Sequence, residues 1–145
     1  MIDICDENKR FSLEVCSYEF PSASDSDDAN WLLVEVQVED GEGVSWSAKE
    51  ACLRTFELVE LLDWFRSVLV GRLEKGIYFT EGELAFSYLA DKILCVSLDF
   101  GFHPKGLDYV YGVDCEKLVK FSIDQKTISG VIKGLELSVS KFPIR

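Results

Sequence analysis

A chain of 145 residues, of which 48% are hydrophobic, is long and apolar enough to form one domain with its own core, and too apolar to be disordered. Its net charge of −11 argues against binding to nucleic acid or to membrane surfaces. The sequence contains no apolar run long enough to span a membrane. It also lacks the basic start followed by an apolar stretch that is typical of a secretory signal, so we expect a cytosolic protein.

Alternation of apolar and polar residues predicts strands in the first third of the chain. The pattern runs over 10–20, with a change of phase near Tyr18 that indicates a bulge, and again over 31–39. The segment between them (PSASDSDDAN) consists of turn formers and predicts a polar loop. The sequence DGEG at 40–43 predicts a turn, so 31–39 and a strand returning from Val44 form a hairpin.

Two segments have the period of amphipathic helices. The first covers 56–70, with Thr55 as its N-cap and Gly71 at its end, and we place Glu57 on its solvent face. The second covers 124–141 and begins at Asp124. Its two glycines lower helix propensity, which leaves a strand as the rival interpretation.

The second half of the chain otherwise predicts strands, at 77–80, 84–88, 94–102 and 118–123, with an aromatic loop at 103–112. Helices and strands do not alternate one for one. We therefore predict an α+β fold in a single domain, residues 1–145: an antiparallel sheet of about six to seven strands, with one central and one C-terminal helix packed on it. The expected core includes Val34, Val36, Phe86, Val96 and Leu98.

The cysteines are an odd number at wide spacings, and only one histidine accompanies them. This pattern lacks the spacing of a zinc site and does not suggest a disulfide framework. We expect free thiols, no metal and no cofactor. The residues concerned are Cys5, Cys16, Cys52, Cys95 and Cys115.

The sequence contains no signature of a catalytic site. The single histidine, His103, precedes a proline in a loop, away from any known nucleophile motif. The run that starts at Asp25 suggests a calcium loop, but its sixth position is Asn30 rather than glycine and its twelfth is Val36 rather than glutamate. A small hydrolase remains an alternative, and a deep pocket with two carboxylates of raised pKa would favour it. The candidate carboxylates are Glu81, Glu83 and Asp99.

Acidic residues are segregated along the chain. Nine acids and no lysine or arginine occur between Phe11 and Ala48. Because a surface of one sign steers a partner of the opposite sign, we predict that this region binds a basic protein. We expect its six carboxylates in the loop and at the turn to be exposed, with Trp46 as an exposed apolar anchor and the loop 103–112 as the next candidate. The predicted binding residues are Asp25, Asp27, Asp28, Glu39, Asp40, Glu42 and Trp46.

Several short motifs resemble one known family. Tyr18-Glu19-Phe20-Pro21, then Asp28-Ala29-Asn30-Trp31-Leu32 leading into a valine-rich strand, then Ser45-Trp46, resemble the opening of the WapI-type immunity proteins of bacterial polymorphic toxin systems. Phe79-Thr80-Glu81 and the closing Phe142-Pro143-x-Arg145 continue the resemblance.

The resemblance implies a partner protein without enzymatic activity. Such a protein binds the C-terminal domain of a cognate toxin, for example one used in contact-dependent growth inhibition, and blocks it in the cytosol. Toxins of this kind are often nucleases with basic clefts, to which an acidic surface is complementary. An acidic adaptor domain that binds other proteins is the alternative within the same broad class.

Overall fold

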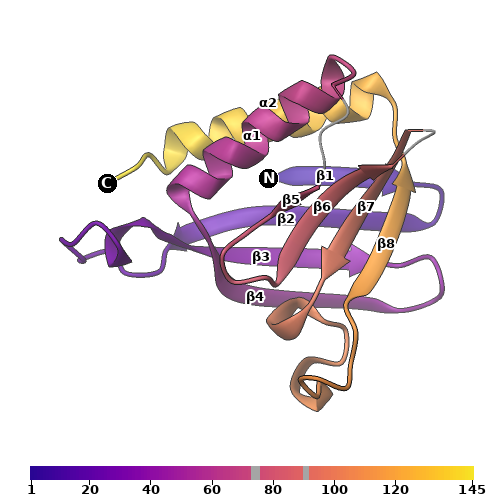
Figure 1. The fold of residues 1–145 in the computed structure, drawn as a ribbon, viewed down its shortest axis with the longest axis horizontal. Coiled ribbons are helices and arrows are strands. Elements are labelled where there is room, and N and C mark those ends of the chain that lie inside the picture. Colours follow the sequence, from indigo (N-terminus) through magenta and orange to yellow (C-terminus); the bar gives the residue numbers. More distant parts are fainter. Residues whose placement is uncertain (73–75, 90–91) are drawn as a thin grey trace.

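The computed structural model describes residues 1–72, 76–89 and 92–145, which form eight strands in two antiparallel sheets together with two long helices (Figure 1). The first sheet has the order β1 (Ile2–Asp6), β2 (Lys9–Tyr18), β3 (Trp31–Glu39) and β4 (Ser45–Arg54). The second has the order β5 (Ile77–Tyr78), β6 (Leu84–Leu89), β7 (Ile93–Leu98) and β8 (Lys117–Ser122). The helices are α1 (Thr55–Leu69) and α2 (Gln125–Lys141), and short 3-10 helices are η1 (Asp28–Asn30), η3 (Phe100–Phe102) and η4 (Gly106–Asp108).

The predicted α+β class is confirmed, with the strands divided between two sheets rather than gathered in one. Strand β1 was missed, although Ile2 and Ile4 alternate with polar residues and are buried against β2. The predicted bulge is confirmed by the register shift between Val15 and Ser17. The strand predicted over 94–102 ends at Leu98, because the backbone turns there into η3.

Helix α1 begins at Thr55, one residue earlier than predicted, so its N-cap is one residue before the predicted cap. Arg54 is the N-cap, and its backbone N–H donates to Oε2 of Glu57 at 2.8 Å. Oε1 of Glu57 accepts both the backbone N–H and the hydroxyl of Thr80, at 2.8 and 2.6 Å. Glu57 was therefore wrongly placed on the solvent face: its carboxylate is buried because it caps the helix and ties it to the segment before β6. Gly71 follows the helix end with a positive φ, as predicted.

The C-terminal segment is a helix, not a strand. Oδ1 of Asp124 accepts the N–H of Thr127 at 2.7 Å, which confirms the predicted cap. Packing explains the glycine at position 134, because a Cβ there would lie 2.5 Å from the carbonyl oxygen of Met1. The glycine lets α2 lie directly on the start of β1, and this packing outweighs its low helix propensity.

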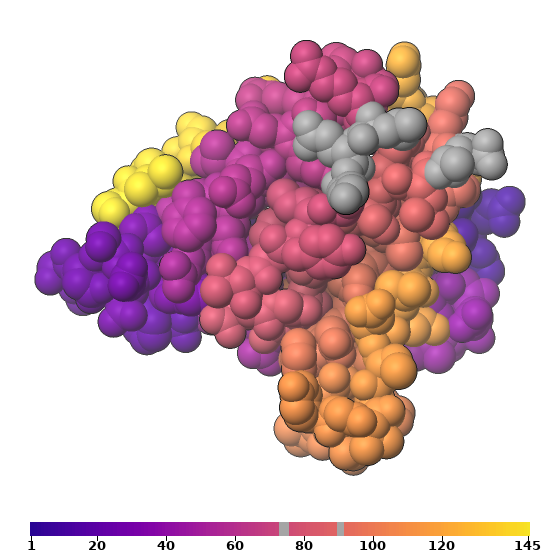
Figure 2. Space-filling model, viewed as in Figure 1, coloured from indigo at the N-terminus to yellow at the C-terminus, as the bar shows by residue number. Residues whose placement is uncertain are grey.

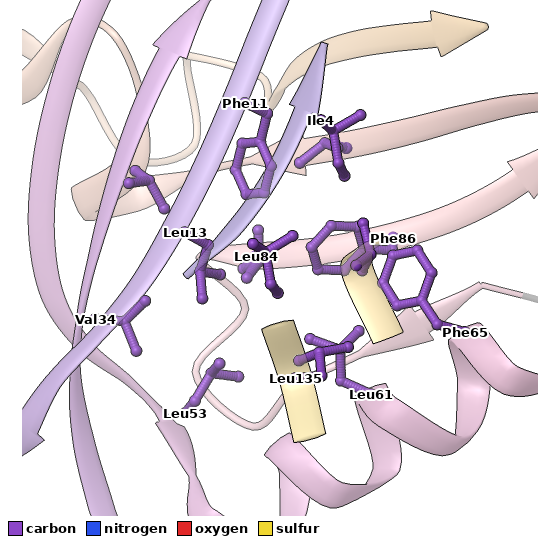
Figure 3. Packing of buried hydrophobic residues seen from close by; sticks show 14 of the residues in the cluster. Ile4, Phe11, Leu13, Val34, Leu53, Leu61, Phe65, Leu84, Phe86 and Leu135 are labelled. Carbon is purple, nitrogen blue, oxygen red and sulfur yellow. The ribbon is translucent and has the colours of Figure 1, made fainter. Parts of the chain in front are cut away.

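One core lies between the two sheets and the helices (Figure 3). Phe86 of β6 is at its centre, with ring centroids 5.9 Å from Phe11 of β2 and 5.7 Å from Phe65 of α1. These contacts join both sheets and α1. All the residues predicted for the core are buried, at most 1% exposed: Val34, Val36, Phe86, Val96 and Leu98.

Candidate functional site

The loop of residues 21–30, here called the acidic loop, carries three of the predicted binding carboxylates. Asp25, Asp27 and Asp28 are all exposed. Oδ1 of Asp25 accepts the backbone N–H groups of Asp27 and Asp28 at 3.0 Å each, which fixes the turn. No ion pair within the described part of the chain involves these three residues. Their charges therefore face water.

Asn30 fastens the acidic loop to the rest of the protein. Its side-chain amide donates to the carbonyl oxygens of Ser26 and Arg145, at 2.8 and 3.0 Å. Its Oδ1 accepts the Thr55 hydroxyl at 2.7 Å and the backbone N–H of Arg145 at 2.9 Å. The guanidinium of Arg145 also donates to the carbonyl of Pro21 at 2.9 Å. The loop is thus bound to the C-terminal residue and to the start of α1.

The turn between β3 and β4 is less open than predicted. Asp40 is buried, with Oδ2 2.7 Å from Nζ of Lys117 on β8, while Oδ1 accepts the N–H groups of Glu42 and Val44. Burial alone would raise the pKa of Asp40, but Lys117 and the two backbone donors outweigh it and hold that pKa below its ordinary value. Lys117 also lies 3.0 Å from Glu42, which is exposed. The prediction that Asp40 is exposed was wrong, because its cation comes from a distant strand.

The two acidic regions lie at opposite ends of β3 (Figure 1). Nine residues separate them, and at about 3.3 Å per residue a strand of this length spans roughly 30 Å. The predicted binding residues therefore do not form one patch. Asp25, Asp27 and Asp28 lie at one end, and Glu39, Asp40, Glu42 and Trp46 lie near the other.

Trp46 was expected to be exposed, but it is half-buried and packs against the core. Its indole Nε1–H donates to the carbonyl oxygen of Phe102 at 2.9 Å. The ring also lines a groove of about 360 Å³ together with Arg10 and Glu39. Trp46 thus joins β4 to η3, and only part of its surface is open to a partner.

Residues 99–116, here called the apolar loop, connect β7 to β8 and project from the body of the protein (Figure 2, orange). Large apolar side chains are exposed along it: Leu107 at 106%, Tyr111 at 80%, Val113 at 74% and Val110 at 52%. Sequence reasoning marked 103–112 as an aromatic loop but did not single out these side chains. The available signal was a group of apolar residues with neither helical nor strand period between turn-forming glycines.

The outer arm of the apolar loop is held by Asp114. Its carboxylate pairs with the ammonium of Lys105, and Oδ2 accepts the backbone N–H of Val110 at 2.7 Å. The backbone N–H of Asp114 donates to the carbonyl of Val110 at 2.9 Å. The hydrogen bonds from Lys105 and Val110 lower the pKa of Asp114, so this carboxylate stays charged at neutral pH. The arm is therefore cross-linked across its width.

The base of the apolar loop is a cluster of aromatic rings. Phe100 stacks on Tyr111 with ring centroids 5.8 Å apart, and Tyr109 packs on His103 at 5.0 Å. The Tyr109 hydroxyl is hydrogen-bonded to Asp99, which raises the pKa of that tyrosine to about 12. His103 is buried, and its Nδ1 accepts the backbone N–H of Lys105 at 3.2 Å. This histidine has a structural role in the loop.

The structure provides only part of what the hydrolase alternative requires. Burial, helped by the charges of Glu81 and Glu50, raises the pKa of Glu83 to about 7. A neighbouring groove of about 410 Å³ is lined by Glu19, Glu50 and Glu81, but Glu83 is not among its lining residues. The carboxylate with the raised pKa and the groove therefore do not coincide.

The described residues also bear on the metal, thiol and membrane expectations. Within residues 1–72, 76–89 and 92–145, no group of three or more metal-binding side chains gathers at one point. All five cysteines are free: Cys5 and Cys115 are exposed, Cys16 is half-buried, and Cys52 and Cys95 are buried. Burial raises the pKa of the Cys52 thiol. None of the helices in the described part of the chain is both long and apolar enough to cross a membrane.

Fold and surface together define a small α+β protein with an exposed charged loop and an ordered, exposed apolar loop. The chain belongs to the WapI-like immunity protein family, whose model matches residues 1–143. Membership implies the role of an immunity protein in a toxin system and confirms the resemblance seen in the sequence motifs. No curated protein and no solved structure matches the chain.

Proposed function

We propose that this chain is a cytosolic immunity protein that binds the C-terminal domain of a cognate toxin and blocks it by occlusion, without catalysing a reaction. The observation that carries the proposal is the family match over residues 1–143. The net charge of −11 supports a basic toxin domain, such as a nuclease, as the partner. Opposite charges raise the association rate of two proteins and orient them as they meet. Occlusion needs only a complementary surface.

The predicted binding residues contribute unequally to this proposal. Asp25, Asp27 and Asp28 are exposed and project from an ordered loop, so they are well placed to attract a basic surface. At the other end of β3, Lys117 already compensates Asp40 and Glu42. Exposed charges of this kind act chiefly on the association rate, so we infer that the carboxylates belong to the rim of the interface.

Co-expression with the toxin domain tests the proposal directly. For an immunity protein we expect the gene of a large toxin directly upstream, and the domain to use is the C-terminal domain of that toxin. Cells that make the active domain should survive only when this chain is present, and an inactivated domain should co-purify with the chain in fixed stoichiometry. Death of the cells despite good expression, together with no co-purification, would exclude the proposal.

A control for charge alone separates the immunity protein from a general acidic adaptor. An unrelated acidic protein of similar size and net charge should neither rescue the cells nor co-purify. Conversely, this chain should not retain unrelated basic proteins at physiological ionic strength, because screening weakens contacts that depend only on charge. Equal binding to any basic protein would support the adaptor.

A further inference from the structure

The apolar loop exposes more hydrophobic surface than a connection between two strands requires. Leu107, Val110, Tyr111 and Val113 occur within seven residues, and each is more than half exposed. Scattered apolar residues are normal on protein surfaces, but a group of large ones on a single projection marks an interaction surface. Tyrosine and large aliphatic side chains in such a group are typical anchors of protein interfaces.

The loop is ordered before any partner binds. Its outer arm is cross-linked through Asp114, and its base is held by the stacking of Phe100 on Tyr111. A surface that already has its bound shape loses little conformational entropy on association. The order of this loop therefore favours binding rather than mere connection.

The loop is also attached firmly to the first sheet. Phe102 is fully buried, and its carbonyl accepts the indole N–H of Trp46. Gly101 lies so close to β4 that a Cβ there would be 2.5 Å from Cγ of Glu50. These contacts fix the loop to β4, so the position of its tip is set by the sheet.

The charges around the loop indicate the chemistry of its partner. Asp108 is exposed next to Leu107, and Glu116 is exposed just before β8 at the base of the loop. At the same base, the charges of Glu50 and Asp99 act on the partly buried carboxylate of Glu83. The lysine within the loop, Lys105, is already paired with Asp114. A partner must therefore offer an apolar recess with a basic border. A second copy of this chain would bring like charges together, which is unfavourable.

We propose that the apolar loop is the anchor of the toxin interface, with Leu107, Val110, Tyr111 and Val113 entering an apolar recess of the basic toxin domain. This inference rests on the proposed immunity function and adds the surface that keeps the complex together. Apolar contacts buried at the centre of an interface determine its lifetime, whereas surrounding charges determine how fast it forms.

A matched pair of double variants tests the inference. The loop variant is Leu107→Ser with Val113→Ser, and the control is Leu137→Ser with Val70→Ser, which removes the same two residue types where they are 72% and 69% exposed. The probe is the inactivated C-terminal domain of the toxin encoded directly upstream, and the readouts are Kd and the dissociation rate. We expect the loop variant to raise Kd by about 100-fold, mostly through faster dissociation, and the control to stay within about threefold.

Each outcome has a distinct meaning. Equal binding of the loop variant and the control, with the parent bound tightly, overturns the inference and leaves the immunity function intact. A parent chain that neither binds the probe nor protects cells overturns the immunity function and this inference with it. If the parent is a dimer by light scattering and only the loop variant is monomeric, the loop joins two copies and the inference is wrong. Thermal melting should be the same for all three proteins, because the exchanged side chains lie in solvent.

Discussion

The acidic loop and the apolar loop are built on the same plan and present opposite chemistry. Each is an irregular segment held by polar groups, Asn30 in the acidic loop, and Asp114 together with the indole N–H of Trp46 in the apolar loop. The first keeps carboxylates in water and the second keeps apolar side chains in water. Charges act over about a Debye length, whereas apolar surface acts only when it is covered. In the proposed function the two loops therefore govern approach and retention respectively.

The two loops depend on one rigid scaffold, and β3 is its central part. Val36 is fully buried on β3, so Val36→Asp removes about 1.5–3 kcal/mol of apolar burial and adds the cost of a buried carboxylate. We expect the variant to be unfolded or nearly so at room temperature and to lose both binding surfaces. Circular dichroism melts would show this, with Glu35→Gln on the outward face of β3 as the control. A melt equal to that of the parent would show that the face is misassigned.

The anchors of the two loops can be compared by removing each one. Asn30→Ala deletes four hydrogen bonds at a buried position and leaves the Thr55 hydroxyl without its acceptor, so we expect a loss of about 2–4 kcal/mol in the free energy of unfolding. Trp46→Phe keeps the ring but removes the N–H that reaches Phe102, and should cost about 1 kcal/mol.

Urea denaturation measures both losses. Because the hydrogen bonds of Asn30 also hold the chain end, Asn30→Ala should in addition expose the acidic loop and Arg145 to proteolysis, while Trp46→Phe should not. Equal losses in the two variants would mean that the acidic loop is no more tightly anchored than the apolar loop.

Features that depend on local sequence patterns could be predicted, whereas features that depend on contacts with distant residues could not. The core face of β3 and the start of α2 at Asp124 follow from periodicity and capping, and both are confirmed. The burial of Asp40 could not be read locally, because its counterion is on β8. The helix pattern placed Glu57 on the charged face of α1. Its carboxylate is buried because it accepts the backbone N–H groups of Arg54, the N-cap, and of Thr80.

The candidate binding residues were predicted less well than the fold, because their position relative to one another depends on the packing of distant segments. The predicted acidic residues lie in one segment of the sequence, but a strand of nine residues places them at opposite ends of a sheet. Exposure in the apolar loop is likewise a property of the fold, since leucine and valine are buried in the neighbouring strands β7 and β8. A sequence pattern can mark both loops as irregular, but only the packing decides which side chains they leave in water.

The carboxylate of Glu83, at the base of the apolar loop, should make the stability of the fold depend on pH. The folded state raises the pKa of Glu83 from 4.5 to about 7, so it binds a proton more tightly than the unfolded state does. The stability that this gives is complete below the unfolded pKa and is lost as pH rises from 4.5 through about 7. Because Glu83 is only partly buried, solvent screening reduces the effect to about 1 kcal/mol.

Glu83→Gln isolates this contribution. We expect the variant to match the parent near pH 5 and to have a higher melting temperature near pH 8, where the parent carries the buried charge. Glu60→Gln, at an exposed position of α1, is the control and should leave the pH dependence unchanged. A difference between Glu83→Gln and the parent that is the same at both pH values would show that the carboxylate does not titrate in this range.

The smallest effect on affinity is expected from the acidic loop itself. Changing Asp25, Asp27 and Asp28 to asparagine removes three charges but keeps the acceptor Oδ1 at position 25, so the turn and the melting temperature should be preserved. Because exposed charges act mainly on encounter, the triple variant should associate several-fold more slowly with the inactivated toxin domain, with a flatter dependence of association rate on salt. The dissociation rate should be almost unchanged, in contrast to the apolar-loop variant. The control is glutamine at Glu7, Glu14 and Glu60, exposed acids outside the loop, which makes the same change in net charge. If both triple variants have the same salt slope, only the total charge matters and the acidic loop has no special part in approach.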